Sequence, residues 1–167
     1  MANSIYKPGY TLSKPVLKVK IIALGSISSS DDALALKALE KLRSLNLPSE
    51  VELIEADRNP CKLVSEVEGC DKLVVIDAIR IGAPPGTIHR IKPDSIKPSR
   101  SITLHRMDTA TIVKLALTLA SEKPKDIVII GLEPYTVDPG LRLSSKIEEE
   151  IDKLVEEVLK EISKENT

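Results

Sequence analysis

The chain has 167 residues, of which 42% are hydrophobic, and its 24 basic and 25 acidic side chains give a net charge of −1. This length and hydrophobic content favour one domain with a single continuous core. The balanced charge offers no basic excess for nucleic-acid binding, and no apolar run reaches membrane-spanning length. Abundant Lys and Glu, with no Phe, Trp or Gln, resemble the composition of hyperthermophile proteins.

Residues 1–16 show no periodic pattern and are polar, with Pro8 and Pro15 among them. We expect them to form an N-terminal arm, neither a signal peptide nor a membrane anchor, ahead of a single domain at residues 17–167. The spacing of Cys61 and Cys70 is not that of zinc ligands. The sequence therefore predicts a cytoplasmic protein whose two thiols are reduced.

The predicted elements alternate between strands and helices. Apolar or alternating runs predict strands at Leu17–Leu24, Glu50–Ala56, Leu73–Ile76, Thr87–Ile91 and Asp126–Leu132. Helical periodicity and helix-start residues predict helices from Leu34 to near Asn46-Leu47-Pro48, at Cys61–Glu68, at Leu104–Ala120 and from Ser145 to Ile162. This alternation implies right-handed crossovers. The predicted fold is therefore a single-domain, doubly wound α/β fold, with a mostly parallel twisted sheet and helices on both faces.

Three finer expectations concern surfaces. The helix at Leu104–Ala120 is expected to bury an apolar face that includes Met107, Ile112, Leu115 and Leu119. The Lys/Glu face of the last helix is expected to be solvated, and residues 92–101 to form an exposed loop. The strand at Thr87–Ile91 is expected to be antiparallel or at an edge of the sheet.

Candidate site residues follow the predicted strands. Asp77 comes at the end of the buried run from Leu73, and ligands of open α/β sheets bind outside the carboxyl ends of the strands. Asp32 follows the first strand, and His105 opens a later helix. Two carboxylates and an imidazole suit a divalent transition metal such as nickel or zinc. Equally, Asp32 can be a helix-start acid, His105 a helix cap and Asp77 the cap of a turn.

Other classes of site find little support. The segment from Gly25 to Ser30 lacks the further glycines of a dinucleotide loop and the Gly-Lys-Ser/Thr of a P-loop. There is no Gly-x-Ser-x-Gly elbow, and neither cysteine has the context of a nucleophile. His89, in the strand after the proline loop, is expected to be structural or to face the substrate.

The ordered motifs resemble those of the maturation endopeptidases of nickel–iron hydrogenases. The most specific part is Asp77-Ala78 followed by Gly82-Ala83-Pro84-Pro85-Gly86-Thr87-Ile88-His89-Arg90. Supporting matches are Leu24-Gly25 with Asp31-Asp32, then His105, then Gly131-Leu132-Glu133-Pro134 and Gly140-Leu141-x-Leu143-Ser144. The resemblance covers the chain from Leu17 to Ile162.

This resemblance implies a hydrolase that removes the C-terminal extension of a hydrogenase large subunit after nickel insertion, and so activates that enzyme. The family's three metal ligands fall on Asp32, Asp77 and His105, which are then also the catalytic residues. The nickel is expected to be presented by the substrate, although another divalent ion could occupy the site. The partner is then the precursor of the large subunit, and neither nucleic acid nor membrane. The mechanism is either metal-assisted or of the aspartic type.

The chain departs from the family pattern in two places. Ser26 replaces the usual Asn, and Glu55-Ala56-Asp57 replaces Asp-Gly-Gly after the second strand, where we expect contact with the substrate. Losing both glycines removes backbone freedom at that point. An alternative is therefore a non-catalytic binding or chaperone module that holds the nickel-loaded subunit. An unrelated nucleotide-binding domain is a further alternative, which the missing phosphate-loop glycines disfavour.

Overall fold

The computed structural model describes residues 17–25, 33–95, 108–134 and 145–163. The strands are β1 (Val19–Leu24), β2 (Val51–Ala56), β3 (Lys72–Ala78), β4 (Ile88–Ile91) and β5 (Asp126–Leu132). The helices are α1 (Ala33–Arg43), α2 (Pro60–Val67), α3 (Thr109–Leu119) and α4 (Ser145–Ser163), with a 3-10 helix η1 at Pro93–Ser95. The predicted N-terminal arm at residues 1–16 lies outside the described residues, as do residues 26–32, 96–107, 135–144 and 164–167.

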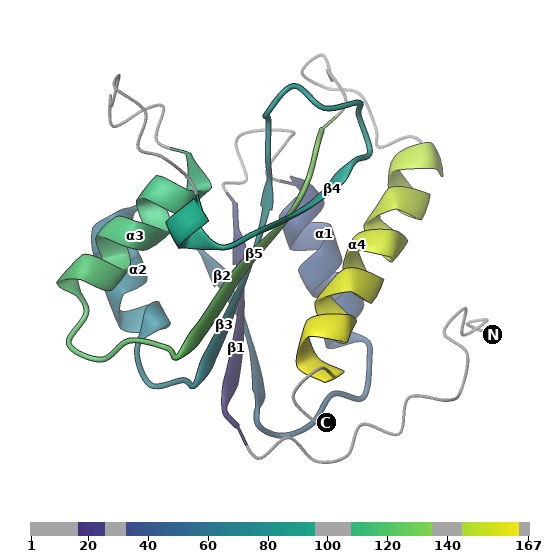
Figure 1. Ribbon diagram of the computed structural model, residues 1–167. Helices are drawn as coiled ribbons and strands as arrows, with labels where there is room; N and C mark the ends of the chain where they lie inside the picture. The colour runs from purple at the N-terminus through teal and green to yellow at the C-terminus, as the bar shows by residue number, and fades with distance from the viewer. Residues whose placement is uncertain (1–16, 26–32, 96–107, 135–144, 164–167) are drawn as a thin grey trace.

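The strands form one sheet in the order β2-β1-β3-β5-β4. Every pair is parallel except β4 with β5, which is antiparallel at the edge of the sheet (Figure 1). From β1 the chain crosses first to β2 on one side and then to β3 on the other. The strand order therefore reverses between β1 and β3, and such a switch point is where open α/β sheets bind ligands. The predicted fold class and edge strand are both confirmed.

Helices cover both faces of the sheet, with α1 and α4 on one face and α2 and α3 on the other (Figure 1). The buried run of β3 serves both layers, because successive side chains of a strand point to opposite faces. Val74 and Ile76 pack in the core on the α1 and α4 side, whereas Leu73 and Val75 pack on the α2 and α3 side. This double burial explains why the strand reads as a continuous apolar run. No helix in the described part of the chain is long and apolar enough to cross a membrane.

Two expectations about α3 are wrong. The helix begins at Thr109, with Asp108 as an N-cap whose side chain accepts a hydrogen bond from the Thr111 N–H, and not at Leu104. Its buried face includes Ile112 as expected, but Leu115 and Leu119 are 40% and 54% exposed. The helix is apolar over most of its surface, so periodicity does not orient it. The buried face also includes small side chains, which allow close packing in the core layer that α3 shares with α2 (Ala110, Val113 and Ala116).

Two expectations of solvated surface need correction. The predicted exposed loop after Ile91 contains η1, and its Pro93 is buried. On α4, Glu161 is only 1% exposed, although it belongs to the Lys/Glu face that was expected to be solvated. The remaining charged residues of that face include Glu157 and Lys160, which form an exposed pair one turn apart.

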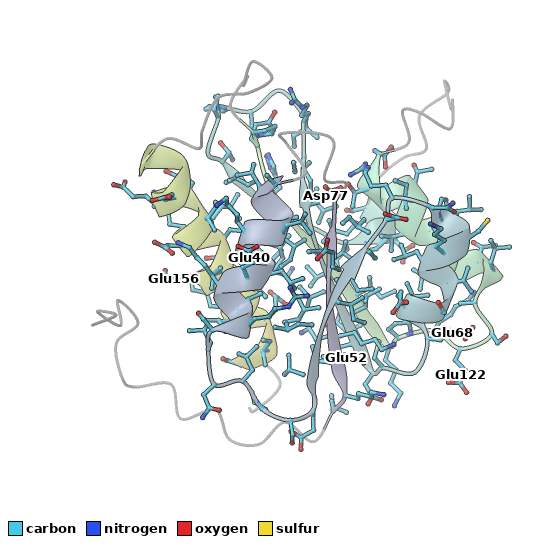
Figure 2. The ribbon with its side chains drawn as sticks, turned by 180° about the vertical axis from the view of Figure 1, so that it is seen from behind. Glu40, Glu52, Glu68, Asp77, Glu122 and Glu156 are labelled. Carbon is cyan, nitrogen blue, oxygen red and sulfur yellow. The ribbon has the colours of Figure 1, made fainter. Side chains whose placement is uncertain are left out.

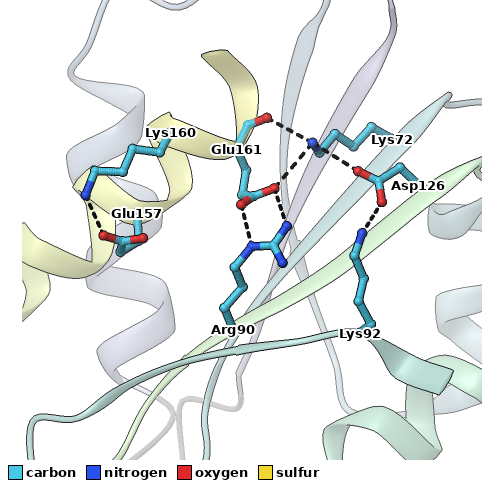
Figure 3. A network of polar contacts seen from close by, with 7 residues as sticks. All are labelled: Lys72, Arg90, Lys92, Asp126, Glu157, Lys160 and Glu161. Carbon is cyan, nitrogen blue, oxygen red and sulfur yellow. Dashed lines mark hydrogen bonds and ion pairs between the residues drawn. The ribbon is translucent and has the colours of Figure 1, made fainter. Parts of the chain in front are cut away.

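Glu161 belongs to a network of charges that ties α4 to the sheet (Figure 3). Arg90 of β4 binds its carboxylate through two nitrogens, with Nε–Oε1 at 2.6 Å and Nη2–Oε2 at 3.1 Å. Lys72, at the start of β3, donates to the Glu161 carbonyl at 2.9 Å and lies 3.1 Å from Asp126 of β5. Lys92 also pairs with Asp126. The buried acid is thus fully compensated by bases from two strands.

Gly131 of β5 lies opposite Asp77 in the β3–β5 register and beneath the Ile79 side chain. A Cβ atom at position 131 would meet three atoms of Ile79, including its Cβ at 2.9 Å, which rotation of the side chain cannot move away. We expect Gly131→Ala to lower the free energy of unfolding by about 1–3 kcal/mol, the usual cost of overpacking. Chemical denaturation measures this loss. Ile79→Ala in the same chain should offset part of it, and simple additivity of the two losses would contradict the clash.

Candidate active site

Asp77 lies near the end of β3, beside the point at which the strand order reverses. Asp77 is 1% exposed, and Figure 2 shows it between the two helical layers. A strand that is apolar from Leu73 to Ile76 therefore carries one carboxylate into the region where this class of sheet binds ligands.

Three donors surround the Asp77 carboxylate. The guanidinium of Arg58 and the hydroxyl of Thr109 both donate to Oδ2, and the Ala78 N–H donates to Oδ1 at 2.8 Å. Burial raises the pKa of Asp77, while Arg58, the Thr109 hydroxyl and the Ala78 N–H each act to lower it. The carboxylate is thus oriented by contacts from three segments: the end of β2, the start of α3 and its own strand.

The other predicted site residues have different positions. Asp32 and His105 lie outside the described residues, so their approach to Asp77 stays a prediction. Within the described ranges, no group of three or more His, Cys, Asp or Glu side chains is arranged to hold a metal ion. In the segment expected to contact the substrate, Glu55 and Asp57 are exposed and Ala56 is half-buried. Asp57 pairs with Lys62 at 2.8 Å.

Sequence reasoning missed Arg58 and Thr109. Arg58 directly follows the altered Glu55-Ala56-Asp57 segment, so the segment reaches the site through its next residue. Thr109 is the first residue of α3 and is 6% exposed. The available signal was an arginine just beyond the carboxyl end of one parallel strand, because another strand of the same sheet was predicted to end in an acid, and the carboxyl ends of parallel strands lie at the same edge of a sheet.

Glu133, which follows β5, anchors the loop that leaves β3. Its carboxylate accepts hydrogen bonds from the N–H groups of Ile81 and Gly82, the latter at 3.1 Å, and lies 2.9 Å from Nε2 of His89. Its backbone binds the same loop, with the Gly86 N–H donating to the Glu133 carbonyl at 2.8 Å. Gly82 and Gly86 have φ angles of 85° and 86°, which favour glycine and let the loop turn around the acid.

His89 makes a structural contact with Glu133, which agrees with one of its two expected roles. The His89 side chain is 11% exposed and faces Glu133. Glu133 was cited only as part of a family motif, and its role in holding the loop emerges from contacts with residues far away in sequence.

Glu133→Gln is expected to destabilise the protein by about 2–3 kcal/mol, because hydrogen bonds to a charged group contribute more to stability than those between neutral groups. Burial acts to raise the pKa of Glu133, but the hydrogen bonds from the loop and from His89 outweigh it, so the pKa is lowered. A lowered folded pKa means that this stabilisation is present above the carboxyl's ordinary pKa and is lost as the pH falls through the folded value.

Denaturation of the wild type and Glu133→Gln across the acid range would measure this. The difference between the two proteins should be largest near neutral pH and should shrink below the ordinary pKa of a glutamic acid. A difference that is independent of pH would contradict a role for the charge of Glu133.

A cavity of about 610 Å³ lies elsewhere, near the amino end of β5, where Lys92, Lys114, Lys123 and Asp126 contribute to its lining. Asp77 pairs with Gly131, close to the other end of the same strand. The cavity and the buried carboxylate are therefore separate features.

The chain is similar in sequence to proteins of one known family. The model of the hydrogenase maturation protease family matches residues 36–161. A hydrogenase expression/formation protein, HupD of Thiocapsa roseopersicina, is 29% identical over 147 residues, which are 85% of this chain and 66%, just under two thirds, of that protein. A putative hydrogenase maturation protease of Methanocaldococcus jannaschii is 29% identical over 155 residues, 87% of this chain and 97% of that protein.

The fold is also that of a solved relative. The hydrogenase maturating endopeptidase HybD from Escherichia coli superposes with a TM-score of 0.71 at 23% identity, covering 87% of this chain and 91% of that one. The family match spans three quarters of the sequence, from α1 to α4, and includes β3 with Asp77 and β5 with Glu133. The chain therefore belongs to the hydrogenase maturation protease family, whose chemistry is peptide-bond hydrolysis.

Proposed function

We propose that this protein is the endopeptidase that removes the C-terminal extension of a nickel–iron hydrogenase large subunit after nickel has been inserted. The observation that carries the proposal is the family match across residues 36–161. The position of Asp77 supports it, because a buried carboxylate at the switch point of the sheet is available for chemistry in the region where the substrate would bind.

In this proposal, Asp32, Asp77 and His105 bind the nickel that the substrate carries. Carboxylate and imidazole are suitable ligands for this metal, so a nickel-free precursor would lack a recognition element. The reaction is hydrolysis: water adds to the carbonyl carbon of the scissile peptide, the C–N bond breaks, and the leaving amine takes up a proton. A metal ion beside that carbonyl would stabilise the negative charge that develops on its oxygen.

The residues expected to contact the substrate are Glu55, Ala56 and Asp57. The exposure of Glu55 and Asp57 at the end of the edge strand β2 leaves this segment accessible to a second protein. Contact there would place the precursor next to Arg58, whose guanidinium already reaches Asp77.

The test is the intact mass of a nickel-loaded precursor of the large subunit before and after incubation with this protein, beside a nickel-free precursor. We expect loss of a C-terminal peptide from the nickel-loaded sample alone. Cleavage of both samples would contradict nickel recognition while retaining the protease.

Stable binding without a change of mass would favour the alternative, a module that holds the loaded subunit. The exposed Glu55-Ala56-Asp57 segment, which lacks the family's glycines, is the feature that favours this second function. Neither binding nor cleavage with any hydrogenase precursor would overturn both proposals.

A further inference from the structure

The contacts of Asp77 leave little of its carboxylate available. A carboxylate has about four lone-pair directions for hydrogen bonds or metal ions. Arg58 and Thr109 share Oδ2, and the Ala78 N–H takes one direction on Oδ1. The Asp77 side chain is 0% exposed, so an ion that approaches from solvent meets its partners first.

Of these partners, only Arg58 is both charged and accessible. Its side chain is 31% exposed, whereas Thr109 is 6% exposed and Ala78 is part of β3. The Ala78 N–H is part of the β3 backbone, and the Thr109 hydroxyl is neutral and buried at the start of α3. Arg58 follows the end of β2 and has a long flexible side chain, so its guanidinium can move away from Asp77 by rotation about the side-chain bonds.

We propose that Arg58 is an exchangeable counter-ion that occupies Asp77 in the free enzyme and that the nickel of the substrate must displace. This inference rests on the proposed function, because it takes Asp77 as a ligand to the substrate's nickel. A guanidinium at this position compensates the buried carboxylate and repels a free divalent cation. The precursor, which brings nickel together with many protein contacts, can supply the free energy of exchange, whereas a free metal ion cannot.

Arg58 is therefore a specificity-determining residue: it keeps adventitious metal ions away from Asp77 and reserves that carboxylate for nickel held in the precursor. Removing the charge of Arg58 should let the free protein bind nickel. The readout is nickel binding by the enzyme alone, which does not depend on proteolysis.

The experiment compares four tag-free proteins by equilibrium dialysis against Ni²⁺ at one pH and one ionic strength. They are the wild type, Arg58→Gln, the double variant Arg58→Gln/Asp77→Asn, and Arg43→Gln. Arg43 is an exposed residue in the last turn of α1, at the end of the sheet opposite Asp77. Arg43→Gln therefore removes the same charge as Arg58→Gln, but far from Asp77.

We expect Arg58→Gln to bind nickel about tenfold or more tightly than the wild type, since one like charge is removed beside the ligand. Arg43→Gln and the double variant should match the wild type. Equal binding by the wild type and Arg58→Gln would overturn the proposal. Tighter binding that persists in the double variant would overturn it as well, because the metal would then lie elsewhere.

Loss of Arg58 leaves a buried carboxylate uncompensated, and the variant can be less stable for that reason. Thermal unfolding with and without nickel keeps the test decisive. Nickel should raise the midpoint of Arg58→Gln but not that of the double variant, and no rise would count against the proposal. The mass measurement on the wild type tests the proteolytic function separately, so the failure of one proposal is distinguishable from the failure of the other.

Discussion

Asp77→Asn is expected to reduce processing of a nickel-loaded precursor by about 100-fold or more, because a ligand that stabilises charge near the scissile bond contributes several kcal/mol. Asparagine keeps the shape of the side chain, and its single oxygen can accept from either the Thr109 hydroxyl or the Ala78 N–H, which bind different oxygens of the carboxylate. It is therefore more informative than alanine, which would leave a cavity and unpaired donors in a position that is 1% exposed. The rate of peptide release, followed by mass spectrometry, measures the loss.

Asp94→Asn is the matched control, since it changes the same charge on an exposed residue of η1. It should process the precursor at the wild-type rate. His105→Ala is expected to lose processing as Asp77→Asn does, as the resemblance implies. Wild-type processing by Asp77→Asn, with the fold verified by circular dichroism, would remove Asp77 from the mechanism.

Glu161→Ala is expected to lower the free energy of unfolding by about 3–5 kcal/mol, the usual cost of removing one partner from a buried ion pair. The reason is visible in Figure 3: the change leaves Lys72, which is 2% exposed, without one of its two carboxylate partners, and Arg90 without its bidentate contact. Urea denaturation, with the slope compared to exclude a change in the unfolded state, measures the effect.

Glu157→Ala is the matched control on the same helix. Glu157 pairs with Lys160 at 2.6 Å on the surface, and such pairs contribute about 0–1 kcal/mol. The two variants remove the same charge from α4 and differ in burial. Equal losses in the two proteins would show that the network around Glu161 does not stabilise the fold.

The strands were predictable because their patterns are local. Asp126–Leu132 is predicted and observed with the same bounds, since a short β-branched run buried on both faces is continuous in sequence. The end of α2 was also predictable, because Gly69 follows it with a φ of 70°. Parallel pairing and helices on both faces then follow from the alternation of elements.

The sequence gives less information on which face of each helix is buried. In α3, apolar residues surround the helix, and only its tertiary contacts decide that Ala116 is buried while Leu119 is exposed. On α4, the buried Glu161 reads like the solvated glutamates beside it. Its burial depends on Arg90 and Lys72, which are 71 and 89 residues away in sequence.

By itself, the sequence determined the fold class, the place of Asp77 at the end of a central strand and the resemblance to the family, because each is a pattern along the chain. Only the tertiary structure decided what surrounds that carboxylate. Arg58 and Thr109 lie 19 and 32 residues from Asp77, on either side of it in sequence, and meet at one oxygen because the switch in strand order brings their elements together. The cation beside Asp77 is a product of that convergence, which no local pattern encodes.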